Sequence, residues 1–169
     1  AYLIDTGYLE IIDISNTSAP FQRASLQLSG SRVRAAGGNL LYVGCHAGEG
    51  LKVVDVSNAA SPILRGTCPP RMNSQVESVA IKDSLLFVGY TYWEGTYPNI
   101  TTSWGIEVVD VSSPSAPVRI GWYPLPATPN GISVREDYAY VAAGGVRVLN
   151  ISDPAHPVQV GGPASGDRG

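Results

Sequence analysis

The chain repeats one ten-residue motif four times, and no other feature constrains its fold as strongly. The copies read IIDISNTSAP, VVDVSNAASP, VVDVSSPSAP and VLNISDPAHP. Each contains a marker residue that is followed seven positions later by a proline, and the markers are Asp13, Asp55, Asp110 and Asn150. Successive markers are 42, 55 and 40 residues apart. A period of about 40–45 residues with four short strands is typical of a β-propeller blade.

Each repeat is predicted to hold four antiparallel strands, A to D, with strand A innermost. In the third repeat these strands are Glu77–Lys82, Ser84–Tyr90, Gly105–Val111 and Pro117–Tyr123. The chain has 19 glycines and 13 prolines but no convincing amphipathic helix, so we expect an all-β fold. We expect one domain of just under four blades, approximately 1–30, 31–73, 74–126 and 127–169, the first of which lacks strand A.

The marker residue is predicted to cap the turn between strands C and D. A carboxylate or amide oxygen at this position can accept hydrogen bonds from backbone N–H groups of the turn, and the proline restricts φ where strand D begins. The alternative is that the aspartates are ligands or catalysts. Because the residue recurs in every blade, we favour the structural role for Asp13, Asp55, Asp110 and Asn150.

These repeats resemble the LVIVD-repeat family. The resemblance rests on YAYVAAGGVRVLNISDPAHPVQVGG, Tyr138–Gly162, and on LLYVGCHAGEGLKVVDVSNAASPILRG, Leu40–Gly66, and it covers essentially the whole chain. It implies a β-propeller and an origin among the extracellular or surface proteins of bacteria or archaea. It implies no activity, because the family has no general catalytic residues to transfer. Arg34 and Asn150 depart from the family pattern, which has valine and aspartate there.

Just under four blades leave the closure of the ring open. Propellers commonly complete one blade with strands from both termini, but the stretch Pro163–Gly169 has no β-forming residue. The chain begins inside a predicted strand without Met, which indicates a processed chain or a piece of a longer protein. We expect the blades to belong to a larger ring of seven or eight. A ring completed by a second copy and a small closed four-bladed ring are the alternatives.

Function is expected on the face that carries the variable B–C and D–A connections. The third B–C connection, Thr91–Trp104, is long and is predicted to be an inserted loop rich in aromatic residues. Rigid rings on an exposed loop suit recognition of a protein or a sugar, whereas the alternative is that they pack over the blade as a lid. The candidate binding residues here are Tyr92, Trp93, Glu94, Tyr97 and Trp104.

Three further polar residues are expected around the mouth of the central funnel, where strands A begin. They are Arg32, Glu77 and Asn130. Together they form a candidate ligand site. The alternative is that Arg32 and Glu77 pair with each other across adjacent blades.

The two cysteines, Cys45 and Cys68, lie on connections at the same face of the second blade. Strands B and D are about 9–10 Å apart, and a disulfide needs Cα atoms within about 7 Å, so this bond requires the loops to curl inward. Free thiols are the first alternative. A metal site with His46 is the second, but the tight CxxC spacing of many zinc sites is missing and His156 is expected on the opposite face. No metal or other cofactor is predicted.

Catalytic motifs are missing from the sequence, which has two histidines and no GxSxG. Asp5, Glu49, Glu77 and Glu94 are expected on the variable face, but nothing in the sequence sets the carboxylate separation that glycoside chemistry requires. We therefore favour a non-catalytic binding or scaffold module outside the cytoplasm, for example an accessory subunit of a larger assembly. The competing hypothesis is a hydrolase or lyase that acts on a glycan at the funnel.

Charge and hydropathy narrow the partners of such a module. A net charge of −3 gives no basic face for nucleic acid, and no apolar run approaches the roughly 20 residues of a membrane-spanning helix. The expected partner is another protein or further blades of the same propeller, with a glycan or a second copy of the chain as alternatives.

Overall fold

The structure is a computed structural model that describes residues 1–5, 7–28, 31–45, 49–70 and 73–163. These residues form four antiparallel sheets, and the described part contains no helix. The prediction of an all-β chain made of propeller blades is therefore confirmed. Blade 1 has three strands and blades 2 to 4 have four strands each.

The strands follow chain order within every sheet. Blade 1 consists of β1 (Tyr2–Asp5), β2 (Tyr8–Asp13) and β3 (Phe21–Gln27). Blade 2 consists of β4 (Ser31–Gly37), β5 (Leu40–Cys45), β6 (Leu51–Asp55) and β7 (Ile63–Cys68). Blade 3 consists of β8 (Asn73–Lys82), β9 (Leu85–Thr96), β10 (Asn99–Asp110) and β11 (Val118–Leu125). Blade 4 consists of β12 (Gly131–Arg135), β13 (Tyr138–Ala142), β14 (Val146–Asn150) and β15 (Val158–Gly161).

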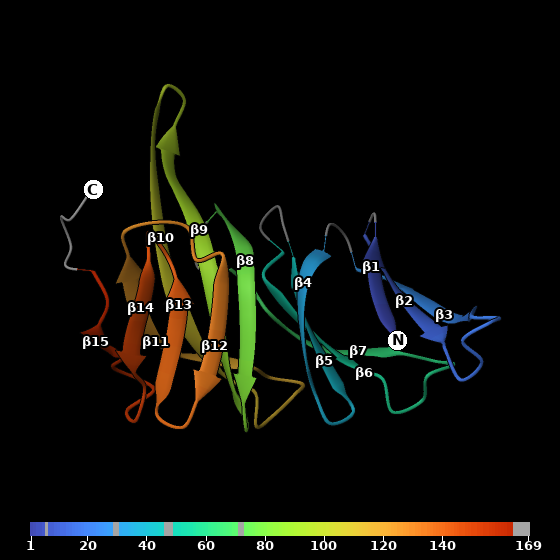
Figure 1. Ribbon diagram of the computed structural model, residues 1–169. Coiled ribbons are helices and arrows are strands. Elements are labelled where there is room, and N and C mark those ends of the chain that lie inside the picture. The colour runs from blue at the N-terminus through green and yellow to red at the C-terminus, as the bar shows by residue number, and fades with distance from the viewer. Residues whose placement is uncertain (6, 29–30, 46–48, 71–72, 164–169) are drawn as a thin grey trace.

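The blades stand side by side in an open row, with blades 1 and 4 at opposite ends (Figure 1). One hydrophobic cluster of buried residues fills each space between consecutive blades. Blades 1 and 4 share none of these three clusters, so the described residues do not close a four-bladed ring.

Side chains alternate along the strands, so each apolar residue belongs to one of the two neighbouring blades. In β6, Leu51 and Val53 belong to the cluster shared with blade 3, and Val54 belongs to the cluster shared with blade 1. In β10, Val108 faces blade 4 and Val109 faces blade 2. This two-sided burial explains why strands B and C are apolar at nearly every position.

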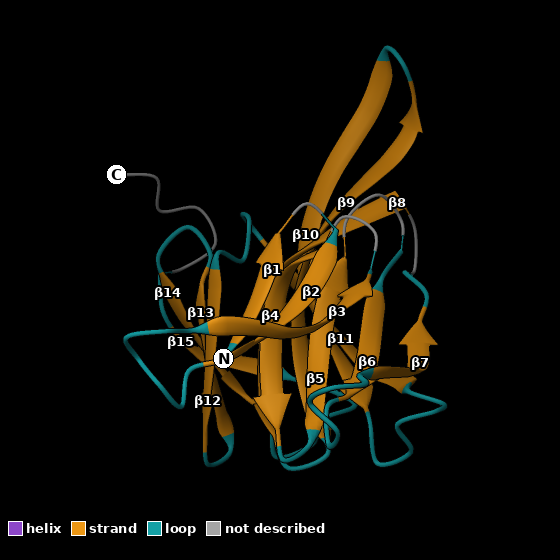
Figure 2. Cartoon of the chain, turned by 90° about the vertical axis from the view of Figure 1, so that its right-hand side faces the viewer, coloured by secondary structure: helices purple, strands orange, loops and turns teal. Residues whose placement is uncertain are grey.

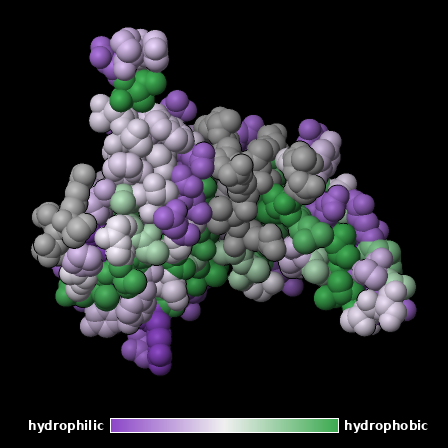
Figure 3. Space-filling view, turned by 45° about the horizontal axis from the view of Figure 1, so that its top comes forward, coloured by the Kyte–Doolittle hydropathy of each residue, from purple (hydrophilic) through white to green (hydrophobic). Residues whose placement is uncertain are grey.

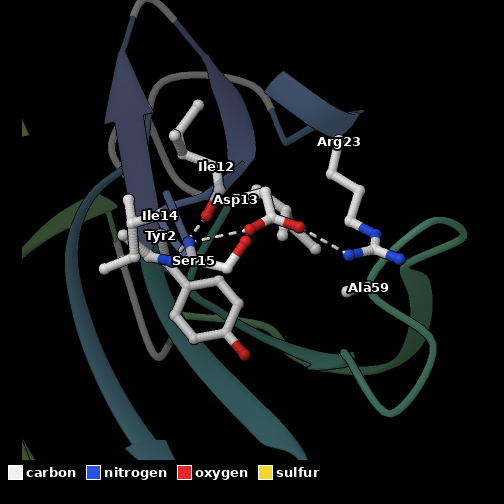
Figure 4. A pocket seen from close by; sticks show the side chains of 9 residues that line it. Tyr2, Ile12, Asp13, Ile14, Ser15, Arg23 and Ala59 are labelled. Atoms are coloured by element: carbon white, nitrogen blue, oxygen red, sulfur yellow. Dashed lines mark hydrogen bonds and ion pairs between the residues drawn. The ribbon is translucent and has the colours of Figure 1, made fainter. Parts of the chain in front are cut away.

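The four C–D turns contain the same capping hydrogen bond. The Oδ1 atom of each marker accepts the backbone N–H of the residue two positions later, at 2.9, 2.8, 2.8 and 2.9 Å for Asp13, Asp55, Asp110 and Asn150. Asp13 also pairs with Arg23 at 2.7 Å (Figure 4), and Asp55 pairs with Arg65 at 2.8 Å. The hollow of about 280 Å³ in Figure 4 is lined by this turn, by Arg23 and by the N-terminal residues Ala1 and Tyr2.

The turns of blades 3 and 4 also rest on the preceding blade. A Cβ at Gly66, in strand D of blade 2, would collide with the carbonyl oxygen of Pro114 in the turn of blade 3. A Cβ at Gly121, in strand D of blade 3, would collide with the carbonyl oxygen of Pro154 in the turn of blade 4. Glycine is therefore required where the two backbones approach most closely.

Truncating a side chain between blades is expected to destabilise the protein strongly. Leu51→Ala removes a fully buried side chain from the cluster between blades 2 and 3 and should lower the free energy of unfolding by about 2–5 kcal/mol. The control Leu64→Ala alters an exposed leucine of the same blade and should change it by less than about 1 kcal/mol. Equal losses from both variants, measured by chemical denaturation, would contradict this account of the core.

The turn aspartates should make stability depend on pH at the acid end. Hydrogen bonds from Ser57 and Arg65 hold the pKa of Asp55 at about 2, below the value of about 3.9 for an unfolded chain. The stabilisation is therefore present above about pH 4 and is lost as the pH falls through about 2. In denaturation curves from pH 2 to 5, Asp55→Asn should show a flatter pH dependence than wild type, whereas Glu94→Gln should not. An unchanged slope in Asp55→Asn would count against the capping role.

Candidate functional site

The inserted segment Thr91–Trp104 is a β-hairpin, which corrects the prediction of a loop. β8 pairs with β9 only as far as Trp93, and β11 pairs with β10 only as far as Trp104. Beyond these residues β9 and β10 pair only with each other. The hairpin therefore projects past the four blades (Figures 1 and 2). We call residues 94–103 the arm.

The aromatic residues of this segment divide into a buried root and an exposed tip. Tyr92 is 2% exposed, so it lies in the interior rather than on the binding surface predicted for it. Its ring lies 5.4 Å from that of Tyr90 and 5.0 Å from that of Trp122, which it meets nearly edge to face. Trp93 and Trp104 are half-buried at the level where the blade ends. These rings anchor the hairpin to blade 3, as the packing alternative predicted for part of the set.

Tyr97, in contrast, stands at the tip of the arm with 89% of its surface exposed. Ile100 is the second exposed apolar residue of the arm, and Glu94 and Asn99 are exposed beside them. Gly95 has a φ of 97°, and a Cβ there would collide with the carbonyl oxygen of Asn99. The tip thus presents one aromatic ring, one aliphatic side chain and polar groups on a hydrogen-bonded hairpin.

Among the described residues, the funnel residues Glu77 and Asn130 have different hydrogen-bond partners. Glu77 accepts hydrogen bonds from Thr91 at 2.6 Å and from Gln75 at 3.2 Å, both in its own sheet. Asn130 is exposed, and its backbone N–H bonds the carbonyl of Ala142. The side chain of Arg32 lies outside the described part of the structure, and so does that of Asp5.

Cys45 and Cys68 are both buried and both free, so this structure contains the free-thiol alternative and not the disulfide. The Sγ atom of Cys45 lies 3.6 Å from the carbonyl oxygen of Leu28. Burial raises the pKa of Cys45 to about 11 and also raises the pKa of Cys68. Both side chains are therefore neutral thiols at neutral pH. His46 lies outside the described residues.

A set of buried charges was not predicted from the sequence, although its members occupy the same position in every repeat. The residue three positions before each marker is charged, and the set is Glu10, Lys52, Glu107 and Arg147. In blades 2 to 4 these side chains are buried.

Each buried charge forms hydrogen bonds or ion pairs. Lys52 donates to the carbonyl of Leu28 at 2.8 Å and pairs with Glu49 at 2.5 Å. Glu107 pairs at 2.5 Å with Arg119, which also donates to the carbonyl of Pro69. Arg147 donates to the carbonyl of Ala143 at 3.0 Å and to that of Pro163 at 3.1 Å.

The charges of blades 2 and 3 hold the connections between blades. Leu28 and Pro69 lie just beyond strand D of blades 1 and 2, so Lys52 and Arg119 fasten each of these connections to the blade that follows. Charges that are paired and hydrogen-bonded tolerate burial. We therefore interpret these buried charges as structural rather than catalytic or ligand-binding. Within the described ranges, no three His, Cys, Asp or Glu side chains come together as a metal site.

Comparison with known proteins decides the family. The model of the LVIVD repeat matches residues 1–27, 33–69, 95–124 and 129–162, which is most of the chain. The chain belongs to the LVIVD-repeat family. The resemblance drawn from the sequence is thereby confirmed. A search of the curated proteins finds no match.

A solved structure supports the fold of this LVIVD-repeat chain. Apo AztD from Citrobacter koseri is similar over 100% of this chain and 48% of its own, with a TM-score of 0.51 and 16% sequence identity. A hypothetical selenium-binding protein from Sulfolobus tokodaii is similar over 94% of this chain and 57% of its own, with a TM-score of 0.38 and 13% identity. The chain thus spans about half the length of these structures. The described residues contain no helix that is long and apolar enough to span a membrane.

The two thiols are expected to resist alkylation in the native protein. Both are buried neutral thiols at pH 8, and the thiolate is the reactive species. Iodoacetamide at pH 8 should leave both unmodified in the folded protein and modify both in denaturant, as read by mass spectrometry. The control Thr67→Cys places an exposed thiol beside Cys68, and only that thiol should react under native conditions. Rapid native labelling of Cys45 or Cys68, or no labelling after unfolding, would contradict this description.

Proposed function

We propose that this LVIVD-repeat chain is a non-catalytic binding or scaffold module that contacts a protein partner through the arm. The observation that carries the proposal is the exposed tip, where Tyr97 and Ile100 stand clear of the blades on a hairpin of fixed register. Its role outside the cytoplasm, as a module or accessory subunit of a larger assembly, is proposed from the character of the family alone.

The arm is built in a way that suits recognition of a partner. Its root is held by the rings of Tyr92 and Trp122, so the tip is positioned before any partner arrives. A preorganised contact loses less conformational entropy on binding than a mobile loop does. Tyrosine supplies a large amphipathic contact area with few rotatable bonds and is enriched among the residues that dominate interface energies.

The acidic residues of the variable face do not favour the glycan-acting enzyme. Glu49 is paired with Lys52, Glu77 is bonded to Thr91 and Gln75, and Glu94 lies on the arm. Glycoside hydrolysis needs two carboxyl groups facing one bond across about 5–10 Å. Since Glu49 and Glu77 are already held by partners of their own, we do not propose the enzyme.

Site-specific crosslinking tests the proposal. A photoreactive amino acid at position 97, in protein added to extracts of the source organism, should give a discrete crosslinked product. The same amino acid at Val118, which is also exposed but lies at the opposite ends of the strands, should not give that product. Unlabelled wild-type protein should compete, whereas the double variant Tyr97→Ala with Ile100→Ala should compete at least tenfold less well.

Two results would contradict the proposal. One is the same set of products from positions 97 and 118. The other is undiminished competition by the double variant, provided that its denaturation curve matches that of wild type. A product that is removed by glycosidase treatment would indicate that the arm contacts a glycan rather than a protein.

A further inference from the structure

One asparagine of the chain, Asn130, is followed directly by glycine. In the other cases the following residue is Thr, Leu, Ala, Ser or Ile. Asparagine is a thermolabile residue, because the next backbone nitrogen can attack its side-chain amide. Glycine has no side chain to obstruct this attack and moves more freely than other residues. The sequence therefore singles out the bond between Asn130 and Gly131.

The structure also separates Asn130 from several other asparagines. The side chain of Asn130 is exposed. Beyond the adjoining residues, no described atom lies within 4 Å of the place where a Cβ on Gly131 would stand. The amide oxygens of Asn16, Asn58 and Asn150 instead accept backbone N–H groups of their turns, at 3.1, 3.0 and 2.9 Å. Asn130 thus combines an exposed amide with an unobstructed neighbour.

The main chain is held firmly before Asn130 but only by the end of a ladder after it. Ser78 Oγ donates to the carbonyl of Pro129 at 2.6 Å, and the N–H of Asn130 donates to the carbonyl of Ala142 at 3.0 Å. Gly131 pairs with Ala142 in the first pair of the β12–β13 ladder. Terminal pairs open more readily than the interior of a sheet. The Gly131 nitrogen can therefore be released while the rest of β12 stays paired.

We propose that Asn130 is a site of spontaneous deamidation in the folded protein. The nitrogen of Gly131 bonds to Cγ of Asn130, the bond from Cγ to Nδ2 breaks, and ammonia leaves with the proton of the attacking nitrogen. The product is a five-membered succinimide ring. Water then opens this ring at Cγ, which gives aspartate, or at the backbone carbonyl carbon, which gives isoaspartate. Both products gain a carboxylate, and water is the only co-reactant.

This modification falls on the connection between blades 3 and 4. The connection lies at the same end of the blades as the root of the arm (Figure 1), and Figure 3 shows this face with the arm projecting from it. Aspartate changes only the charge there. Isoaspartate adds one carbon to the main chain between Asn130 and Gly131 and so displaces Gly131 from Ala142. We expect the isoaspartate form to be less stable, because β12 enters its sheet through this pair.

Ageing of the purified native protein at 37 °C and pH 8 tests the proposal. Trypsin places each asparagine of the chain on a different peptide, and the peptide of residues 120–135 contains only Asn130. The mass increase of an amide that becomes an acid should appear in this peptide at least tenfold faster than in any other. Methylation by an isoaspartyl methyltransferase should label the same peptide.

Three variants serve as matched comparisons. Gly131→Ala adds a methyl group where space is open and should slow the reaction at least tenfold. Ser133→Ala alters an exposed residue of the same strand and should leave the rate unchanged. Asn130→Asp adds the charge of the product without lengthening the main chain. It should keep the denaturation midpoint of fresh wild-type protein, whereas aged protein that contains isoaspartate should unfold at lower denaturant concentration.

Three results would overturn the proposal. The first is a folded protein in which residues 120–135 stay unmodified, or in which another asparagine reacts first. The second is Gly131→Ala reacting as fast as wild type. The third is a midpoint of Asn130→Asp as low as that of the aged protein, which would assign the loss of stability to charge rather than to the longer main chain.

Discussion

The fold depends on apolar contact between consecutive blades. A single four-stranded sheet of this kind has no core of its own, and every buried cluster is shared by two sheets. Strands B and C therefore carry apolar residues on both faces, and the glycines of strand D allow the next turn to approach. Because burial of apolar area is the main favourable term in folding, the stability of each blade is inseparable from that of its neighbours, as in other repeat proteins.

Polar groups set the register of these contacts rather than adding to the core. The capping bonds fix each C–D turn, and the turns of blades 3 and 4 rest on strand D of the preceding blade. Lys52, and Arg119 held by Glu107, fasten the connections between blades through the carbonyls of Leu28 and Pro69. The arm stands outside this frame, because none of its residues belongs to the clusters between blades, and it is the segment that we propose for recognition.

Much of this architecture could be predicted from the sequence because the signals are local and repeated. The period, the apolar runs such as VVDV and the marker-to-proline spacing each determine a neighbouring strand or turn. The hairpin was missed because Asn99–Ser103 has no covered face, so it lacks the apolar alternation that marks a strand. The burial of Tyr92 and Glu107 depends on Trp122 and Arg119 in another strand. Such long-range partners are invisible in a local pattern.

Hydrogen–deuterium exchange along β10 tests most directly whether contact between blades, rather than strand pairing, holds the protein together. Both halves of this strand are hydrogen-bonded to β9, but only the half from Gly105 to Asp110 lies between neighbouring blades. Comparison should be limited to amides that bond β9. We expect those of the inner half to exchange at least a hundredfold more slowly than those of Asn99–Ser103. Uniform protection along the strand would contradict the account.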